Sequence, residues 1–183
     1  MEPKRLKEIS KSLSYVLRHR PDTVGIELET GGWVSVDTLM AAFRREGKHL
    51  TAEILHEVVG QNDKQRFEFS DDGLRIRARQ GHSVEVDLGY VPALPPNLLF
   101  HGTATCFLES IRKLGLIKGK RHHVHLSTNQ QTMIQVGMRH GTPVVLTVQA
   151  AQMHASGHEF FVTGNGVWLT DHVPPQFLVF DQE

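Results

Sequence analysis

The sequence predicts an α+β protein made of two lobes, the first mainly helical and the second rich in strands. Apolar residues recur at helical spacing through roughly the first 60 residues, after which the period changes to two. The proline-rich stretch 91–96 is typical of a stiff connector. Beyond it, short apolar runs separated by turn residues indicate strands and two or three short helices. We therefore expect lobes at residues 1–90 and 98–183, with a linker at 91–97.

The composition narrows the possible functions. Of 183 residues, 20 are Lys or Arg and 20 are Asp or Glu, so affinity for phosphate or nucleic acid requires a local cluster of cations. The single cysteine, Cys106, cannot form an internal disulfide and is typical of a reducing compartment. No apolar run approaches the ~20 residues of a membrane span, and no hydrophobic signal region follows the N-terminus. We expect a cytoplasmic monomer with no membrane partner.

Three helices are expected in the first lobe. The first ends before Pro21, so its last residues are the cationic run Arg18-His19-Arg20. Cations at a helix C-terminus interact favourably with the helix dipole, by ~0.3 to 1 kcal/mol, so ordinary capping explains this run as well as a binding site does. A second helix follows Ser35 as its N-cap and stops at Gly47, and a third opens at Thr51.

A β-hairpin follows the third helix. After Asn62-Asp63, two strands of alternating polarity, 66–69 and 74–79, flank the turn Asp71-Asp72-Gly73. Three helices followed by a hairpin indicate a winged-helix unit. The second strand places three arginines on one face, Arg75, Arg77 and Arg79. Such a row suits a phosphate backbone, although a solvated outer strand face explains it equally well.

The second lobe begins with an apolar strand, 98–100, that leads into His101-Gly102-Thr103. A glycine at a strand end allows the backbone to approach a ligand. The remaining expected elements are helices at 107–114 and 133–136, strands at 144–148, 160–162 and 177–180, and a hairpin turn at Asn165-Gly166 that leads into 167–170.

The run 121–127 carries the clearest chemical pattern in the chain. As a strand it has one polar face and one largely apolar face, the polar face being formed by Arg121, His123, His125 and Ser127. A half-exposed strand is one interpretation. A second is a Zn²⁺ site at His123 and His125, which requires a further ligand. A third is an anion site, in which Arg121 binds a phosphate and the imidazoles donate protons.

Among the polar residues named above in both lobes, arginines are common and carboxylates are rare. Metal sites for hydrolysis usually include Asp or Glu, so the inventory favours an anion site over zinc. No G-x-G-x-x-G follows a strand and no Walker A sequence is present. A bound nucleotide would therefore be held by a fold of another kind.

Six segments in order resemble the NAD-dependent RNA 2'-phosphotransferases of the KptA type, and the resemblance covers essentially the whole chain. The segments are 17–21 (LRHRP), 63–67 (DKQRF), 76–83 (IRARQGHS), 100–103 (FHGT), 121–127 (RHHVHLS) and 165–170 (NGVWLT). The resemblance implies an N-terminal winged-helix RNA lobe and a C-terminal lobe of the ADP-ribosyltransferase fold.

The resemblance also implies a two-step reaction on RNA that carries an internal 2'-phosphate, such as a tRNA splice junction. The 2'-phosphate first attacks the nicotinamide ribose of NAD⁺, a co-substrate, and expels nicotinamide. The ribose 2-hydroxyl then attacks the phosphate, which releases 2'-hydroxyl RNA and ADP-ribose 1'',2''-cyclic phosphate. No metal is expected.

Site residues follow from the same resemblance, position by position. The family's Arg-His-Arg-Arg tetrad maps onto Arg18, His19, Arg66 and Arg121. Residues expected to bind NAD⁺ are His101, Gly102, Thr103, His123, His125, Ser127, Arg139 and Val167. Residues expected to bind RNA are Arg75, Arg77, Arg79 and His82. Val167 lies where many ADP-ribosyltransferases have a Glu, which a phosphate nucleophile does not need as a base.

Two other functions remain open on the sequence alone. One is a mono-ADP-ribosyltransferase that modifies protein or a terminal nucleic-acid phosphate. The other is a winged-helix RNA-binding protein whose second lobe has lost its chemistry. NAD⁺ turnover with and without 2'-phosphorylated RNA distinguishes all three.

Overall fold

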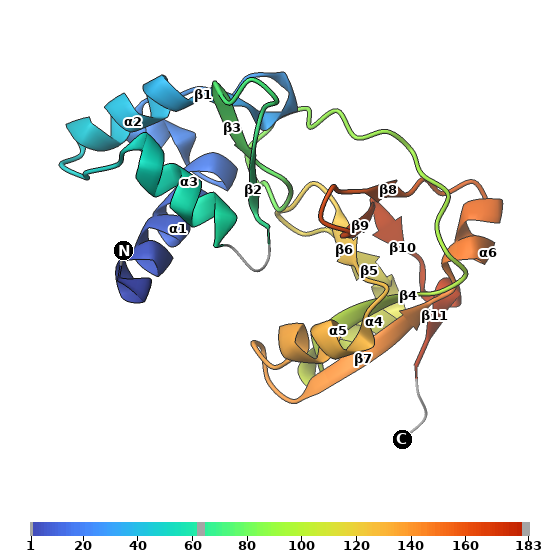
Figure 1. Cartoon of the computed structure of the whole chain (residues 1–183). Coiled ribbons are helices and arrows are strands. Elements are labelled where there is room, and N and C mark those ends of the chain that lie inside the picture. Colours follow the sequence, from blue (N-terminus) through green and yellow to red (C-terminus); the bar gives the residue numbers. More distant parts are fainter. Residues whose placement is uncertain (1, 62–64, 181–183) are drawn as a thin grey trace. The chain divides into compact units, whose positions relative to one another are not determined.

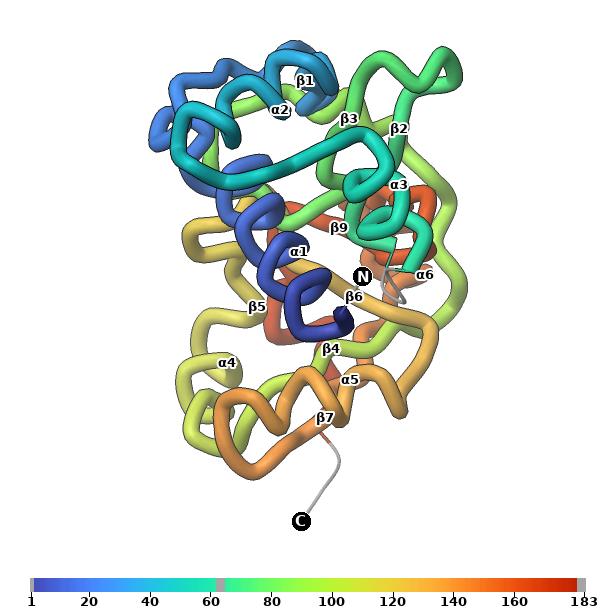
Figure 2. Tube along the Cα trace, turned by 60° about the vertical axis from the view of Figure 1, so that its left-hand side comes forward, coloured from blue at the N-terminus to red at the C-terminus, as the bar shows by residue number. Residues whose placement is uncertain are grey.

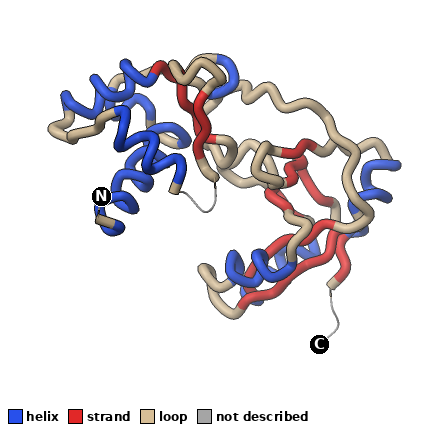
Figure 3. The backbone as a smooth tube through the Cα atoms, viewed as in Figure 1, coloured by secondary structure: helices blue, strands red, loops and turns tan. Residues whose placement is uncertain are grey.

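The computed structural model describes residues 2–61 and 65–180. The chain divides into two compact units, Met1–Gly89 and Tyr90–Glu183, each with a hydrophobic core of its own. Helices dominate the first unit and strands the second (Figure 3), which confirms the α+β class. The predicted break at Asn62-Asp63 and the first two residues of the segment 63–67 lie outside the described residues.

The described part of the first unit has three α-helices, which Figure 1 shows in blue to green: α1 (Pro3–Arg18), α2 (Val36–Arg45) and α3 (Ala52–Gly60). Both predicted N-caps are confirmed, because the Ser35 hydroxyl accepts the Thr38 N–H and the Thr51 hydroxyl accepts the Ile54 N–H. Two short 3₁₀ helices, η1 (Pro21–Val24) and η2 (Thr30–Gly32), connect α1 to the first strand. The predicted end of α1 before Pro21 is also confirmed.

A small antiparallel sheet completes the first unit, with strand order β1-β3-β2: β1 (Val34–Ser35), β2 (Phe67–Phe69) and β3 (Arg75–Ala78). The hairpin formed by β2 and β3 confirms the prediction, and Gly73 supplies the positive φ that its turn requires. Strand β1 was not predicted, because two residues are too short to show a period. Its pairing with β3 depends on the tertiary structure.

The core of the first unit holds the end of α1 in place. Leu13, Val16 and Leu17 of α1 are buried against residues from the other helices and from the inner face of the sheet. Alternate residues of β3, Ile76 and Ala78, belong to the same core. The last turn of α1 is therefore fixed by packing on its apolar side, while Arg18 and His19 extend beyond it.

In the second unit the described residues form eight strands: β4 (Leu99–Ala104), β5 (Leu116–Ile117), β6 (Val124–Leu126), β7 (Pro143–Val148), β8 (Phe161–Val162), β9 (Trp168–Thr170), β10 (His172–Val173) and β11 (Leu178–Val179). They form two three-stranded sheets, β11-β7-β4 and β6-β9-β8, and the pair β10-β5, all antiparallel. An isolated bridge between Phe100 and Ser127 joins β4 to the start of the loop after β6.

Three helices and two 3₁₀ turns accompany these strands: α4 (Leu108–Leu114), α5 (Gln130–Gly137), α6 (Ala150–Ala155), η3 (Thr105–Phe107) and η4 (Pro175–Phe177). Helix α5 packs on β4 and β7, as Figure 2 shows. The approach is so close that a Cβ on Gly102 would lie 2.8 Å from the carbonyl carbon of Met133. Gly102 is therefore required for the packing of α5 on β4.

Two sequence predictions about the second unit need correction. His101-Gly102-Thr103 lies within β4 and not at the end of a strand. The expected strand 121–127 is shorter, because residues 121–123 form a bend and only Val124–Leu126 is a strand, with Ser127 in the bridge. The predicted alternation holds where the strand exists, since Val124 and Leu126 are buried and His125 is half-buried.

The predicted linker at 91–97 belongs to the second unit. Pro92 forms a bridge with Phe161, the Ala93 N–H donates to the Phe160 carbonyl, and the Ala151 N–H donates to the Asn97 carbonyl. Prolines in this stretch rigidify the backbone, but carbonyl and amide groups next to them still pair with β8 and α6. Among the described residues, no helix is both long and apolar enough to cross a membrane.

We predict that Gly102→Ala destabilises the protein by about 1 to 3 kcal/mol, because the added methyl group forces α5 away from β4. Gly60→Ala is the matched control, since a Cβ there meets nothing within 4 Å. Urea denaturation measures the free energy of unfolding of both variants. Equal stability of Gly102→Ala and wild type would show that α5 does not pack on β4 as described.

Candidate active site

The loop 80–84 is bound to the end of α1 through the backbone. The carbonyl of Arg18 accepts the N–H of Ser83 at 2.8 Å and that of Val84 at 3.3 Å. This carbonyl is one of the last four of α1, which have no partner inside the helix. The loop therefore satisfies the helix end, and Ser83 is fixed next to His19.

His19 is the C-cap of α1, and its side chain is exposed. Its Nδ1 is hydrogen-bonded to the Ser83 hydroxyl at 2.9 Å. A hydroxyl can donate or accept, so this bond holds the ring both when the imidazole is neutral and when it is charged. The ring is held through Nδ1, which suits Nε2 for proton transfer to a bound group.

The Arg18 side chain contacts both Arg66 and the loop 80–84. The Arg18 guanidinium donates to the Arg66 carbonyl at 3.4 Å, and it lies beside Gly81, where an added Cβ would be 3.5 Å from Nη1. Gly81 has φ +84°, a conformation that favours glycine. Arg18, His19 and the backbone of Arg66, three of the four tetrad positions, are therefore neighbours within the first unit.

His82 was expected to bind RNA, but its side chain is buried. Its side chain is only 1% exposed, and its ring lies next to the position that a Cβ on Gly32 would occupy, as does Leu88. A ring buried in this way does not reach a surface ligand. His82 therefore anchors the loop 80–84 to the interior of the first unit.

Arg75 and Arg77 share one face of β3, as predicted, and Arg79 follows just after the strand, but carboxylates accompany all three. Glu68 forms ion pairs with Arg77 at 2.6 Å and with Arg79 at 3.2 Å. Glu29 lies 3.6 Å from Arg75. These partners reduce the positive field that a phosphate backbone would meet along this row.

In the second unit, neighbouring strands bring together the three segments expected to bind NAD⁺. The N–H and carbonyl of Phe100 both bond to Ser127, at 2.8 and 3.0 Å, which joins β4 to the end of β6. Strand β6 in turn pairs with β9, so that His125 lies opposite Leu169. Segments about 25 and 65 residues apart in sequence therefore occupy adjacent positions.

His101 is held in one tautomer within this strand cluster. Its Nδ1–H donates to the His125 carbonyl at 3.0 Å, so Nε2 of the neutral ring is an acceptor. Burial lowers the pKa of His101 below 6.5, and the positive charge of Arg121 lowers it further, against the opposing effect of the hydrogen bond. His101 is therefore a neutral acceptor at physiological pH.

Gly102 presents its peptide groups to the edge of β4. Both backbone groups of Phe100 point away from β7, toward Ser127. Residues two apart in a strand point the same way, so the N–H and carbonyl of Gly102 also point to this edge. The Ser127 hydroxyl accepts the Asn129 N–H at 3.0 Å and keeps its own hydrogen for a further acceptor.

Arg121 and His123 precede β6 in the bend. The side chain of Arg121 is exposed and forms no ion pair with any residue in 2–61 or 65–180. His123 is half-buried in an aromatic cluster with Tyr90 and Phe161, at ring distances of 5.9 and 5.5 Å. Burial lowers the pKa of His123, assisted by the nearby His122 and Lys118.

The remaining residues expected to bind NAD⁺ differ in how they are placed. Thr103 is buried in β4. Val167 follows the Asn165-Gly166 turn, where its N–H bonds to the Thr163 hydroxyl at 3.0 Å. Arg139 is exposed in the turn after α5, and the structure does not bring it to the strand cluster through any direct contact among the described residues.

Comparison with known proteins shows the family of the chain. Residues 4–172 match the family described as "RNA 2'-phosphotransferase, Tpt1 / KptA family". The chain belongs to this family. A "probable RNA 2'-phosphotransferase" of Burkholderia lata is 56% identical over 171 residues, which are 93% of this chain and 88% of that protein.

Two further relatives carry the same name. The protein of Acaryochloris marina is 51% identical over 175 residues, covering 96% of this chain and 97% of its own length. That of Pseudomonas aeruginosa is 51% identical over 179 residues, covering 97% and 98%. Membership of the Tpt1/KptA family, expected from the six segments, is thereby confirmed.

Sequence reasoning missed several residues that shape the site of this Tpt1/KptA chain. Ser83 was part of a matching segment, but nothing in the sequence showed that its hydroxyl meets His19. Thr163 is buried and organises the turn before β9 through bonds to Asn165 and Val167. A threonine two residues before Asn-Gly is a usable signal for such a turn.

We predict that His101 makes stability depend on pH. Its pKa is lowered in the folded protein, so below about 6.5 the unfolded chain binds a proton that the folded chain does not. The free energy of unfolding should therefore fall as pH drops through and below this value. His101→Gln should flatten the profile, whereas His49→Gln, at an exposed position, should not. Denaturation from pH 5 to pH 8 tests this, and superimposable profiles for wild type and His101→Gln would contradict it.

Proposed function

We propose that this protein removes an internal 2'-phosphate from RNA by transferring it to NAD⁺. The observation that carries the proposal is the gathering of the family segments in each unit. Arg18 and His19 contact the loop 80–84, and the Arg18 guanidinium also reaches the Arg66 carbonyl. The three expected NAD⁺ segments meet on β4, β6 and β9. Family membership supports the RNA 2'-phosphate as substrate.

The groups on β4 and β6 fit the nicotinamide riboside end of NAD⁺. The edge N–H and carbonyl of Gly102 complement the carbonyl and NH₂ of a carboxamide. His101 Nε2 accepts a hydrogen bond from a ribose hydroxyl, and the hydroxyl of Ser127 donates one. A neutral His101 also avoids placing a second positive charge next to the cationic nicotinamide ring.

In the first step, an oxygen of the 2'-phosphate forms a bond to the anomeric carbon of the nicotinamide ribose. The bond to nicotinamide breaks, and its electron pair neutralises the ring. The nucleophile is already an anion and the leaving group is already activated, so the protein mainly has to orient the two. This explains why Val167, and not a general base, is sufficient directly before β9.

In the second step, the ribose 2-hydroxyl attacks the phosphorus, and the RNA 2'-oxygen leaves. The attacking hydroxyl loses a proton and the leaving oxygen gains one. A single imidazole can therefore accept the first proton and donate the second. We assign this transfer to His19, whose ring Ser83 holds at 2.9 Å. Guanidinium groups stabilise the charge that develops on the phosphoryl oxygens, a role for Arg18, Arg66 and Arg121.

The direct test incubates the protein with NAD⁺ and an oligonucleotide bearing one internal 2'-phosphate. We expect 2'-hydroxyl RNA, nicotinamide and ADP-ribose 1'',2''-cyclic phosphate in equal amounts. We also expect activity to survive excess EDTA, since the proposed residues need no metal. NAD⁺ turnover without loss of the 2'-phosphate would favour a mono-ADP-ribosyltransferase acting on another acceptor.

We predict that Ser83→Ala lowers kcat about fivefold, because a neutral hydrogen bond contributes about 1 kcal/mol to the position of the His19 ring. The KM for RNA should change little, since the phosphate-binding arginines remain. Ser83→Thr keeps the hydroxyl and should retain most of the activity. A rise in KM at constant kcat would show that Ser83 binds substrate and does not position His19.

We predict that Arg121→Ala slows the second step by roughly 10²- to 10³-fold, as expected for loss of one donor to a developing oxyanion. ADP-ribosylated RNA should then accumulate. Arg121→Lys should be a poor substitute, because it lacks the planar fork that binds two phosphate oxygens. Arg44→Ala, at an exposed position on α2, is the control. Quenched-flow analysis on a gel detects the intermediate, and equal slowing of both steps would argue against this role.

A further inference from the structure

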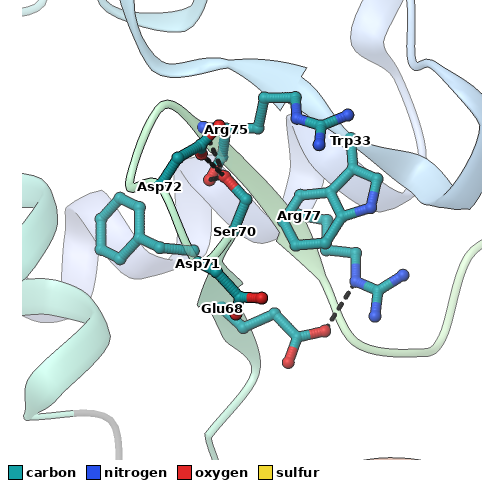
Figure 4. Close-up of a pocket in the computed structure, with 8 residues that line it drawn as sticks. Trp33, Glu68, Ser70, Asp71, Asp72, Arg75 and Arg77 are labelled. Carbon is teal, nitrogen blue, oxygen red and sulfur yellow. Dashed lines mark hydrogen bonds and ion pairs between the residues drawn. The ribbon is translucent and has the colours of Figure 1, made fainter.

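A groove lies on the outer face of the first unit's sheet, away from the buried face that holds Ile76 and Ala78. It has a volume of about 400 Å³ and is open to solvent. Figure 4 shows its lining: Trp33, Glu68, Phe69, Ser70, Asp71, Asp72, Arg75 and Arg77. The reaction proposed above assigns no role to this groove, of which only Arg75 and Arg77 were expected from the sequence to bind RNA.

The strand register explains why these side chains meet. Val34 pairs with Ile76, so Trp33 lies at the next position along, opposite Arg77. Glu68 pairs with Arg77 from the other side. Trp33, which directly precedes β1, therefore forms one row with Arg77 of β3 and Glu68 of β2 on the same face of the sheet.

The indole of Trp33 forms a stacking surface with the arginines. The Arg77 guanidinium lies 4.4 Å from the ring centre, and that of Arg75 lies 5.6 Å from it. Arg77 is fixed further by Glu68 at 2.6 Å and by the Gly31 carbonyl at 3.1 Å. Planar groups already ordered by ion pairs lose little entropy when another flat ring stacks beside them.

The charge in the groove does not suit a phosphate. Three carboxylates, those of Glu68, Asp71 and Asp72, face two guanidinium groups. Asp72 accepts hydrogen bonds from the Ser70 hydroxyl and the Leu74 N–H. Glu68 forms ion pairs with Arg77 and Arg79. Asp71 makes no hydrogen bond or ion pair with the residues that the structure describes. In the view of Figure 4 the turn residues lie to the left and the indole to the right.

We propose that this groove binds an unpaired guanine base of the RNA substrate. The inference rests on the proposed function for its choice of RNA as the partner. The base stacks on Trp33 and the adjacent guanidinium planes, as single-stranded bases do on aromatic and Arg side chains. Its N1–H and N2–H donate to the two oxygens of Asp71.

Among the four bases, guanine has the edge that matches a carboxylate best. It offers two adjacent donors, whereas adenine and cytosine place a ring nitrogen acceptor beside their amino group. Uracil offers one donor between two acceptors, which a carboxylate repels. The carboxylates that disfavour a phosphate therefore favour guanine, and the row that was expected to follow the RNA backbone instead recognises a base at Arg75 and Arg77.

Tryptophan fluorescence tests the groove directly, because the chain has only two tryptophans, Trp33 and Trp168. The 183-residue chain is titrated with five-nucleotide oligouridylates that carry guanosine, inosine or adenosine at the central position. We expect guanosine to bind about fivefold or more tightly than adenosine, with inosine between them because it lacks the N2 amino group. The quenching should persist in Trp168→Phe and be absent in Trp33→Phe. Equal binding of all three RNAs, or quenching that comes from Trp168 alone, would overturn the proposal.

Two variants separate base recognition from folding. Asp71→Asn should abolish the preference for guanosine, whereas Glu46→Gln makes the same charge change at an exposed position of the first unit and should preserve it. Trp33→Leu keeps an apolar side chain without a π face and should weaken binding of every oligonucleotide about fivefold or more. If Trp33→Leu fails to fold by circular dichroism, the comparison of Asp71→Asn with Glu46→Gln still decides the question. An unchanged preference in Asp71→Asn would overturn the assignment of that carboxylate.

Activity measurements distinguish failure of this inference from failure of the proposed function. The same oligonucleotides with an internal 2'-phosphate, guanosine being moved through each position, are assayed for KM and kcat. One register should lower KM in wild type but not in Asp71→Asn, with kcat unchanged. Removal of the phosphate at KM values independent of base and of Asp71 would overturn the inference and leave the function intact. Guanosine-dependent quenching without removal of the phosphate would overturn the proposed function, whereas the proposal that the groove binds guanine would stand.

Discussion

The backbone pair between Phe100 and Ser127 is the contact on which the second unit's candidate site depends. It joins the strand that carries His101 and Gly102 to the segment that carries His125. It also aligns the peptide groups of Gly102 with an open strand edge. The placement of neighbouring side chains follows from this pairing. His101 donates a hydrogen bond to the His125 carbonyl. Burial and the charge of Arg121 lower the pKa of His101, so its ring is neutral.

A similar constraint operates in the first unit, where a helix end and a loop satisfy each other. The Arg18 carbonyl needs partners outside its helix, and the amides of Ser83 and Val84 provide them. Because the same bonds fix the loop, they also place the Ser83 hydroxyl against His19 and Gly81 beside the Arg18 guanidinium. The position of the candidate catalytic groups is thus a by-product of capping a helix.

The arginines of this protein have different electrostatic surroundings, which separates their proposed roles. Arg121 is exposed and has no carboxylate partner among the described residues, so its charge is available to a phosphate. Arg77 and Arg79 share Glu68, and Arg75 lies near Glu29. Paired guanidinium groups retain a flat stacking face after their charge has been compensated, and such a face suits a base better than a phosphate.

The sequence by itself determined the elements whose signals are local. Pro21, the N-caps Ser35 and Thr51, and the Asn165-Gly166 turn each act within a few residues, and the six segments identified the family. The structure alone decided what depends on distant pairing. Three of these features join residues far apart in sequence: the strand β1, the row from Trp33 to Glu68 and the bond from Ser83 to His19. The burial of His82 likewise depends on the tertiary structure. A local pattern reports which face of a strand a residue occupies, but not which strand lies beside it, because register is set by packing of the whole unit.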